Sequence, residues 1–265
     1  MVLSRSRIVA PVLAASLALL AILTGAQGVD LAAATYRVEL FARSGLTLWD
    51  SQWYGGHWTF NYSVLFAPVG WLAGIPVMEV VCVAVAAWAF DRLAVARFSR
   101  AGRLGAIAFA VGTVVQVAIG QEPYLLGETL ALVSLLAARS RRRTPALVLA
   151  VASALASPLA GGFLGMAAVA WIIGSWPERR WDVAALAAAA LVPVAAVEVI
   201  FPGQGTMPFP LLNFLGMLAA LVPIAIVAAR RDRAILAGVI LYGAALVFAF
   251  AIPSALGNNI TRRAA

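Results

Sequence analysis

Charged side chains are scarce in this sequence. Asp, Glu, Lys and Arg make up 11% of the 265 residues, whereas hydrophobic residues make up 63%. A soluble domain carries roughly 25% charged residues, so this composition excludes an ordinary soluble protein. Apolar residues in this proportion form long segments separated by short polar ones, which is typical of a multi-pass protein of the cell membrane. We therefore expect an all-α, polytopic transmembrane helical bundle, organised as one domain over residues 1–265.

Lysine is absent and cysteine nearly so. All 19 basic residues are Arg, and they give the chain a net charge of +8. Most of them fall in short clusters between apolar runs, where they act as signals for membrane orientation rather than as a nucleic-acid surface. Cys82 lies within an apolar run, so neither a disulfide framework nor a cysteine metal site is expected.

The apolar runs predict about nine membrane-spanning helices. The run 145–174 is too long for one span and is interrupted at Ser157-Pro158 and Gly161-Gly162, so we divide it in two. An alternative for the first run is a signal peptide cleaved after Ala26, although the run is longer than a usual signal-peptide core. The expected helices are 8–27, 75–96, 104–120, 123–139, two within 145–174, 183–201, 210–229 and 234–252.

The distribution of Arg predicts the orientation of the chain. With a cytoplasmic N-terminus, most Arg clusters fall on the cytoplasmic side, as the positive-inside rule requires. The exceptions are Arg37, Arg43, Arg262 and Arg263. This topology leaves one large outer loop, about 28–74, which has the most room for a binding or catalytic site.

The first part of the outer loop contains Asp30 and a predicted interfacial helix. Apolar residues recur at helical spacing over 31–44, which favours an amphipathic helix lying on the membrane. Its polar side would carry Arg37, Glu39 and Arg43. Asp30 either caps this helix or acts as a general base at the membrane surface. Asp50 is a second carboxylate, which would orient a substrate or bind a divalent cation together with Asp30.

The stretch LWDSQWYGGHWTFNYS, residues 48–63, holds the densest aromatic cluster and the only histidine. Gly55 and Gly56 allow a turn before His57, which is either a hydrogen-bonded structural residue or a proton shuttle or phosphate contact. The aromatic side chains form either a belt at the lipid headgroups or a platform for a sugar or lipid. They are Trp49, Trp53, Tyr54, Trp58, Phe60 and Tyr62.

Few ionisable residues lie inside the predicted spans. Glu79, Glu128 and Glu198 are expected to face the interior of the bundle, and Glu122 lies at a helix end. Such groups are typical of a proton-coupled transporter, which is one alternative function.

Several stretches, taken in order, resemble the GT-C superfamily of membrane glycosyltransferases, in particular its actinobacterial members. The run from Asp30 to Leu72 looks like the first outer loop of these proteins. It is followed by GQEPYLLGE (120–128), ASPLAGGF (156–163) and GNNITRR (257–263). The resemblance implies inverting transfer of a sugar from a polyprenyl-phosphate donor to an acceptor at the outer face, with Asp30 as the catalytic base.

The resemblance also implies where substrates bind. The pocket would be lined by Asp50, His57, Trp53 and Tyr54. The leaving phosphate would contact Arg43, Arg262 and Arg263, with Asn258 and Asn259 as hydrogen-bond donors. The alternative for Arg262 and Arg263 is plain anchoring at lipid headgroups. The implied partners are membrane lipid and a polyprenyl-phosphate-linked sugar, with no cofactor.

The chain departs from the GT-C pattern in ways that leave other functions open. Asp30 has no adjacent carboxylate, the predicted spans are fewer than is common, and no soluble domain follows GNNITRR. We therefore expect a truncated chain that lacks a C-terminal domain. A transporter and a non-catalytic membrane subunit, with an unknown partner, are the alternatives.

Overall fold

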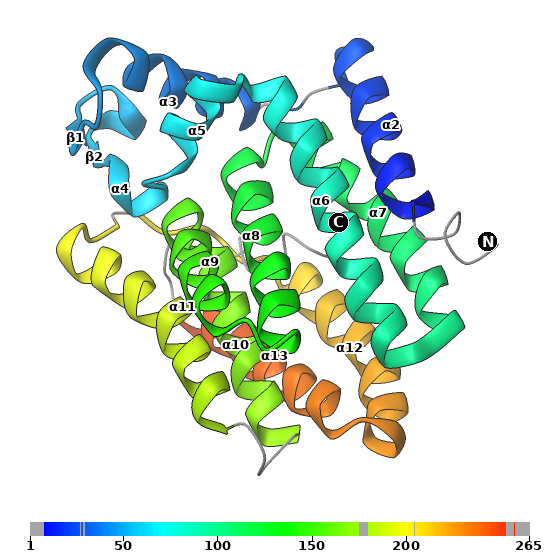
Figure 1. Ribbon diagram of the computed structural model, residues 1–265. Helices are drawn as coiled ribbons and strands as arrows, with labels where there is room; N and C mark the ends of the chain where they lie inside the picture. Colours follow the sequence, from blue (N-terminus) through cyan, green and yellow to red (C-terminus); the bar gives the residue numbers. More distant parts are fainter. Residues whose placement is uncertain are drawn as a thin grey trace.

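The protein is an all-α helical bundle (Figure 1), in which helices account for 84% of the residues that the structure describes. The computed structural model describes residues 8–26, 28, 30–174, 180–203, 205–252 and 257. Every predicted apolar run is a helix, with ends close to those expected. The helices are α2 (Val9–Leu23), α6 (Ile75–Phe98), α7 (Gly102–Ile119), α8 (Glu122–Arg139), α9 (Arg143–Ala156), α10 (Pro158–Gly174), α11 (Arg180–Ile200), α12 (Leu211–Arg231) and α13 (Arg233–Ala251).

The long run 145–174 is divided as predicted, but by a shorter break. Ser157 alone is extended, with φ −155° and ψ 116°, and α10 begins at Pro158, where a missing N–H costs nothing. Gly161 and Gly162 were expected in the turn, but both lie inside α10. A Cβ on Gly161 would lie 2.7 Å from the Cα of Ala154, so this glycine allows α9 and α10 to pack closely instead.

Four stretches of the described chain are long and apolar enough to cross a membrane. They are Ile75–Ile119, which contains α6 and α7, together with α11, α12 and α13. The helices α2, α9 and α10 are apolar but shorter. These stretches suggest a multi-pass membrane protein, whereas the expected number of about nine spans stays a prediction.

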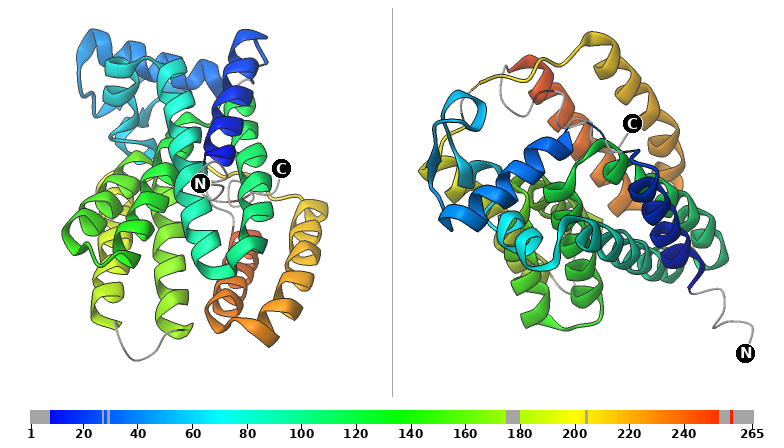
Figure 2. Two further views of the ribbon diagram at one scale, coloured as in Figure 1. Left: turned by 45° about the vertical axis from the view of Figure 1, so that its right-hand side comes forward. Right: turned by 90° about the horizontal axis from the view of Figure 1, so that it is seen from above.

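The turns between helices gather at two ends of the bundle (Figures 1 and 2). At the end called here the basic end, Arg97 of α6 forms an ion pair of 2.6 Å with Asp232, which lies between α12 and α13. Arg139 at the end of α8 donates to the carbonyl oxygen of Ala96 at 3.1 Å. At the opposite end, called the loop end, the N–H of Val64 donates to the carbonyl oxygen of Leu155 at 2.8 Å.

Residues 30–73 cover the loop end with short elements (Figure 1). The predicted interfacial helix is present as α3 (Asp30–Ser44). A small antiparallel hairpin and two more helices come after α3, and none of them was predicted from the sequence. They are β1 (Trp49–Asp50), β2 (His57–Trp58), α4 (Thr59–Tyr62) and α5 (Phe66–Ala73), with a 3₁₀ turn at Trp53–Gly55 inside the hairpin.

The first half of α8 forms the centre of the molecule. Every residue from 121 to 129 is buried. Helix α8 packs on α6 and α9, and its side chains bond to both. The hydroxyl of Thr129 donates to the carbonyl oxygen of Cys82 at 3.1 Å, and that of Ser153 donates to the carbonyl oxygen of Gly127 at 2.8 Å. The GQEPYLLGE stretch is therefore a core segment rather than a surface loop.

Candidate functional site

Asp30 is held at the loop end by close backbone packing. It begins α3 and is half-buried. A Cβ on Gly120, in the turn between α7 and α8, would lie 2.3 Å from the backbone N of Leu31, and a Cβ on Gly28 would lie 2.6 Å from the carbonyl oxygen of Ile119. Only glycine permits this approach. The start of α3 therefore rests directly on the turn that leads into α8, and a carboxylate there is favoured by the helix dipole.

Two buried carboxyl groups lie beside Asp30. Glu79 of α6 is 0% exposed and Glu122 of α8 is 1% exposed. The two carboxyl groups lie close enough to interact electrostatically, and Asp30 acts on Glu122 in the same way. None of the four carboxyl oxygens of the pair has a hydrogen-bond partner among the described residues.

Glu128 and Glu198 were also predicted to face the interior of the bundle. The prediction is confirmed for Glu128 and wrong for Glu198. Glu128 is buried as expected, and it accepts a hydrogen bond of 2.5 Å from Nε2 of Gln116. Glu198 was expected to face the interior but is exposed, because it lies near the end of α11 and accepts from Nδ2 of Asn61 at 2.9 Å.

Arg37 is the residue whose surroundings differ most from those predicted. It was placed on the polar face of the interfacial helix, but it is only 4% exposed. Its Nη2 donates to the carbonyl oxygen of Ser63 at 3.1 Å, and its guanidinium lies 5.3 Å from the ring centre of Trp53. Its Nε and Nη1 have no hydrogen-bond partner among the described residues. Burial lowers the pKa of Arg37 to about 10.

A buried cation with unused donors is costly unless an anion meets it. Asp30 and Arg37 are spaced i, i+7, which puts them within about 20° of the same face of α3 and roughly 10 Å apart along its axis. Ala34 between them is 1% exposed and marks this face as the inward one. The i, i+7 spacing was the sequence signal that could have predicted the burial of Arg37, because it places Arg37 on the inward face of α3 rather than on its polar side.

A small pocket adjoins Arg37. Its volume is about 10 Å³, which suits one water molecule. The turn at Gly45–Thr47 supplies one wall, and Phe41 and Phe60 supply others. A ligand larger than water would enter Arg37's surroundings only after this turn moves outward.

Asp50 serves mainly to fasten the hairpin to α3. Its Oδ2 accepts from the hydroxyl of Tyr36, and its Oδ1 accepts from the backbone N–H of Gln52 at 2.9 Å. Burial acts to raise the pKa of Asp50, but these two hydrogen bonds and the charges of Arg37 and Arg43 together outweigh it and lower the pKa below its ordinary value. The same hydrogen bond to Asp50 is the main cause that raises the pKa of Tyr36.

The Tyr36–Asp50 bond predicts that the hairpin loosens in acid. Because the folded state lowers the pKa of Asp50, this stabilisation is present above the unfolded pKa of about 4 and is lost as the pH falls through the folded value. Hydrogen exchange of residues 48–58 is expected to accelerate below about pH 4. In Tyr36→Phe the same exchange is expected to be fast already at neutral pH. Identical pH profiles in the two proteins would contradict this role.

The structure separates Asp50 and His57 from Asp30. Asp50 is bonded to Tyr36, which lies six residues, or roughly 9 Å of helix axis, beyond Asp30. His57 is paired with Asp50 across the hairpin, and its ring centre lies 6.1 Å from that of Tyr54. Glu122 is therefore the ionisable neighbour of Asp30, whereas Arg37 interacts electrostatically with Asp50 and shares only a helix face with Asp30.

The remaining predicted binding residues lie in varied surroundings. Trp53 is 6% exposed and stacks on Tyr36, with ring centres 5.8 Å apart, whereas Tyr54 is 70% exposed. Arg43 is exposed in the last turn of α3. Asn258, Asn259, Arg262 and Arg263 lie outside the described residues. Within the described part of the chain, no three His, Cys, Asp or Glu side chains form a group that could hold a metal ion.

No protein-family model matches this chain, and no curated protein or solved structure is detectably similar to it. Its function is therefore inferred from its own residues and their arrangement.

Proposed function

We propose that this chain is an integral membrane protein that transfers a sugar from a polyprenyl-phosphate donor to an acceptor at the outer face of the cytoplasmic membrane. The observation that carries the proposal is that Asp30 and the buried Arg37 lie on one face of α3, roughly 10 Å apart along its axis. A carboxylate suits the acceptor hydroxyl, whose proton it accepts, and a guanidinium with unused donors suits the leaving phosphate. The resemblance of the loop to GT-C enzymes supports the same chemistry.

In the proposed reaction, Asp30 accepts the proton of an acceptor hydroxyl. The acceptor oxygen attacks the anomeric carbon of the donor sugar while the bond from that carbon to the phosphate oxygen breaks on the opposite side, so the configuration inverts. The phosphate leaves with the bonding electrons. Nε and Nη1 of Arg37 donate to its oxygens, because a guanidinium binds phosphate with two parallel hydrogen bonds.

The orientation follows from charge. Arg97, Arg139, Arg141, Arg142, Arg143, Arg230, Arg231 and Arg233 all lie near the basic end. The positive-inside rule assigns that end to the cytoplasm. The loop end, with Asp30 and Arg37, then faces outward, where polyprenyl-linked sugars are used.

A comparison of two Arg variants tests the proposal. Arg37→Gln is expected to lower the transfer rate by about 100-fold, because charge-assisted hydrogen bonds to the leaving phosphate are worth about 3 kcal/mol. Arg43, which the sequence also predicted to contact the phosphate, is exposed at the end of the same helix, so Arg43→Gln is expected to stay within about twofold. The assay measures sugar release from labelled polyprenyl-phosphate sugars by purified protein in vesicles, and melting curves confirm folding. Arg37→Lys keeps the charge and is expected to fall between the two.

Equal losses in Arg37→Gln and Arg43→Gln would remove Arg37 from the site. Full activity of a folded Arg37→Gln variant would do the same.

A proton-coupled transporter is the second candidate, because one observation favours it. The Glu79–Glu122 pair and Glu128 place three buried carboxyl groups on α6 and α8, as proton relays do. Transport would require these groups to exchange protons with both sides of the membrane. Sugar transfer instead depends on Asp30 and Arg37, so variants of these two residues separate the candidates.

A further inference from the structure

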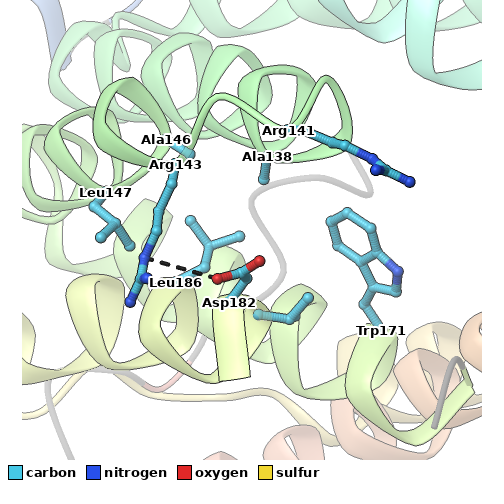
Figure 3. Close-up of a pocket in the computed structure, with 9 residues that line it drawn as sticks. Ala138, Arg141, Arg143, Ala146, Leu147, Trp171, Asp182 and Leu186 are labelled. Carbon is cyan, nitrogen blue, oxygen red and sulfur yellow. Dashed lines mark ion pairs between the residues drawn. The ribbon is translucent and has the colours of Figure 1, made fainter. Parts of the chain in front are cut away.

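A second pocket opens at the basic end, far from Asp30 (Figure 3). It lies among the ends of α8, α9, α10 and α11 and has a volume of about 30 Å³. Apolar side chains such as Leu147 and Leu186 form its floor. The rim is polar and consists of Arg141, Arg143, Trp171 and Asp182.

The rim has more basic than acidic side chains, and its acidic side chain neutralises them only weakly. Nε of Arg143 lies 3.7 Å from Oδ1 of Asp182, and the two side chains are 64% and 49% exposed, so this ion pair contributes little. Arg141 has a φ of 61° and stands in the turn after α8, where Figure 3 shows its side chain extending on the same side as Trp171. Arg142 and Arg180, which neighbour rim residues in the sequence, are also exposed.

Aromatic and apolar surface beside the pocket indicates contact with lipid. Trp181 is 73% exposed and lies at the start of α11, one of the long apolar helices, with the guanidinium of Arg180 5.3 Å from its ring centre. Exposed Trp and Arg at the end of an apolar helix mark the level of the lipid headgroups. Val148 of α9 is 62% exposed, so apolar surface continues along the helix from the pocket.

We propose that this pocket binds the phosphate of an anionic phospholipid headgroup. Arg143 exchanges its loose contact with Asp182 for the phosphate oxygens, and Arg141, on the Trp171 side of the pocket, attracts the headgroup electrostatically from the opposite end (Figure 3). The acyl chains lie along the apolar surfaces of α9 and α11. Basic pockets between membrane helices on the cytoplasmic side are suited to such headgroups. The proposal is independent of the sugar-transfer reaction and requires only that the helices lie in a bilayer.

Fluorescence quenching by brominated lipid tests the proposal. The full chain is reconstituted in phosphatidylcholine vesicles that contain either brominated phosphatidylglycerol or brominated phosphatidylcholine, and the difference between the wild type and Trp171→Phe isolates the Trp171 signal. Brominated phosphatidylglycerol is expected to quench Trp171 more strongly. Arg141→Gln and Arg143→Gln are tested as separate variants. Each is expected to lower the preference for phosphatidylglycerol about fivefold.

The matched controls are Arg230→Gln and Arg231→Gln, each of which removes one charge from the basic end outside the pocket and is expected to keep the preference. Asp182→Asn removes the competing carboxylate and is expected to raise it. Equal quenching by the two lipids, or equal losses in the pocket and control variants, would overturn the proposal. Displacement of the lipid by millimolar inorganic phosphate would also overturn it, because the pocket would then be a site for soluble anions.

Discussion

Replacing Asp30 with Asn is expected to lower the rate of sugar transfer by about 1,000-fold, within the range that a general base contributes. The amide is nearly isosteric but does not accept the proton of the acceptor hydroxyl. Donor binding is expected to change little, since Arg37 still meets the phosphate. Measured in vesicles, the turnover number should therefore fall while the apparent affinity for the donor stays within a few-fold of the wild type.

The control for Asp30→Asn is Glu39→Gln, which neutralises an exposed carboxylate on the same helix and is expected to leave the rate unchanged. Melting temperatures close to that of the wild type would show that both variants fold. Unchanged transfer by Asp30→Asn would remove Asp30 from catalysis. Proton-driven solute uptake that survives this change, in a chain that transfers no sugar, would favour the transporter.

Replacing Gly120 with Ala is expected to damage stability and activity together. Gly120 has a φ of +91°, and the added Cβ would lie 2.3 Å from the backbone N of Leu31. The positive φ costs about 1–2 kcal/mol and the overpacking about 1–3 kcal/mol more. Because the clash falls on the residue after Asp30, the start of α3 has to move away from α8. We expect a clearly lower midpoint of thermal unfolding and a loss of transfer even in the folded fraction.

Gly112 provides the matched comparison for Gly120. It lies within α7, and a Cβ placed there meets nothing within 4 Å. Gly112→Ala is therefore expected to stabilise the helix by about 0.5–1 kcal/mol and to leave activity intact. Wild-type stability of Gly120→Ala would show that α3 does not rest on the α7–α8 turn.

The sequence predicted the long helices well because their signal is local. Apolar runs bounded by Arg clusters mark each helix, and Pro158 marks the break between α9 and α10. Buried Glu79 and Glu128 followed from the cost of a carboxylate in lipid. The interfacial helix over 31–44 was likewise visible in its apolar spacing.

The parts that could not be predicted depend on contacts between distant segments. Arg37 is buried because the hairpin folds back and brings Trp53 and Ser63 over it. The contact between Glu79 and Glu122 depends on how α6 packs on α8. Glu198 is exposed at the loop end, where it accepts a hydrogen bond from Asn61 of another segment. Spacing within α3 places Arg37 on the inward face, but it does not encode which distant residues meet it.

The burial of α8 has a consequence for how the protein is made. This helix carries Glu128 in its interior, and a charged group at the centre of an inserting helix costs on the order of 3 kcal/mol. Its hydroxyl and carbonyl contacts reach α6, which is synthesised earlier, and α9, which is synthesised later. Until the ribosome has synthesised α9, α8 therefore lacks the hydrogen bonds that it makes with that helix. With α8 and α9 as predicted spans, stable insertion of α8 would wait until α9 emerges, so that the two enter the bilayer as one hairpin.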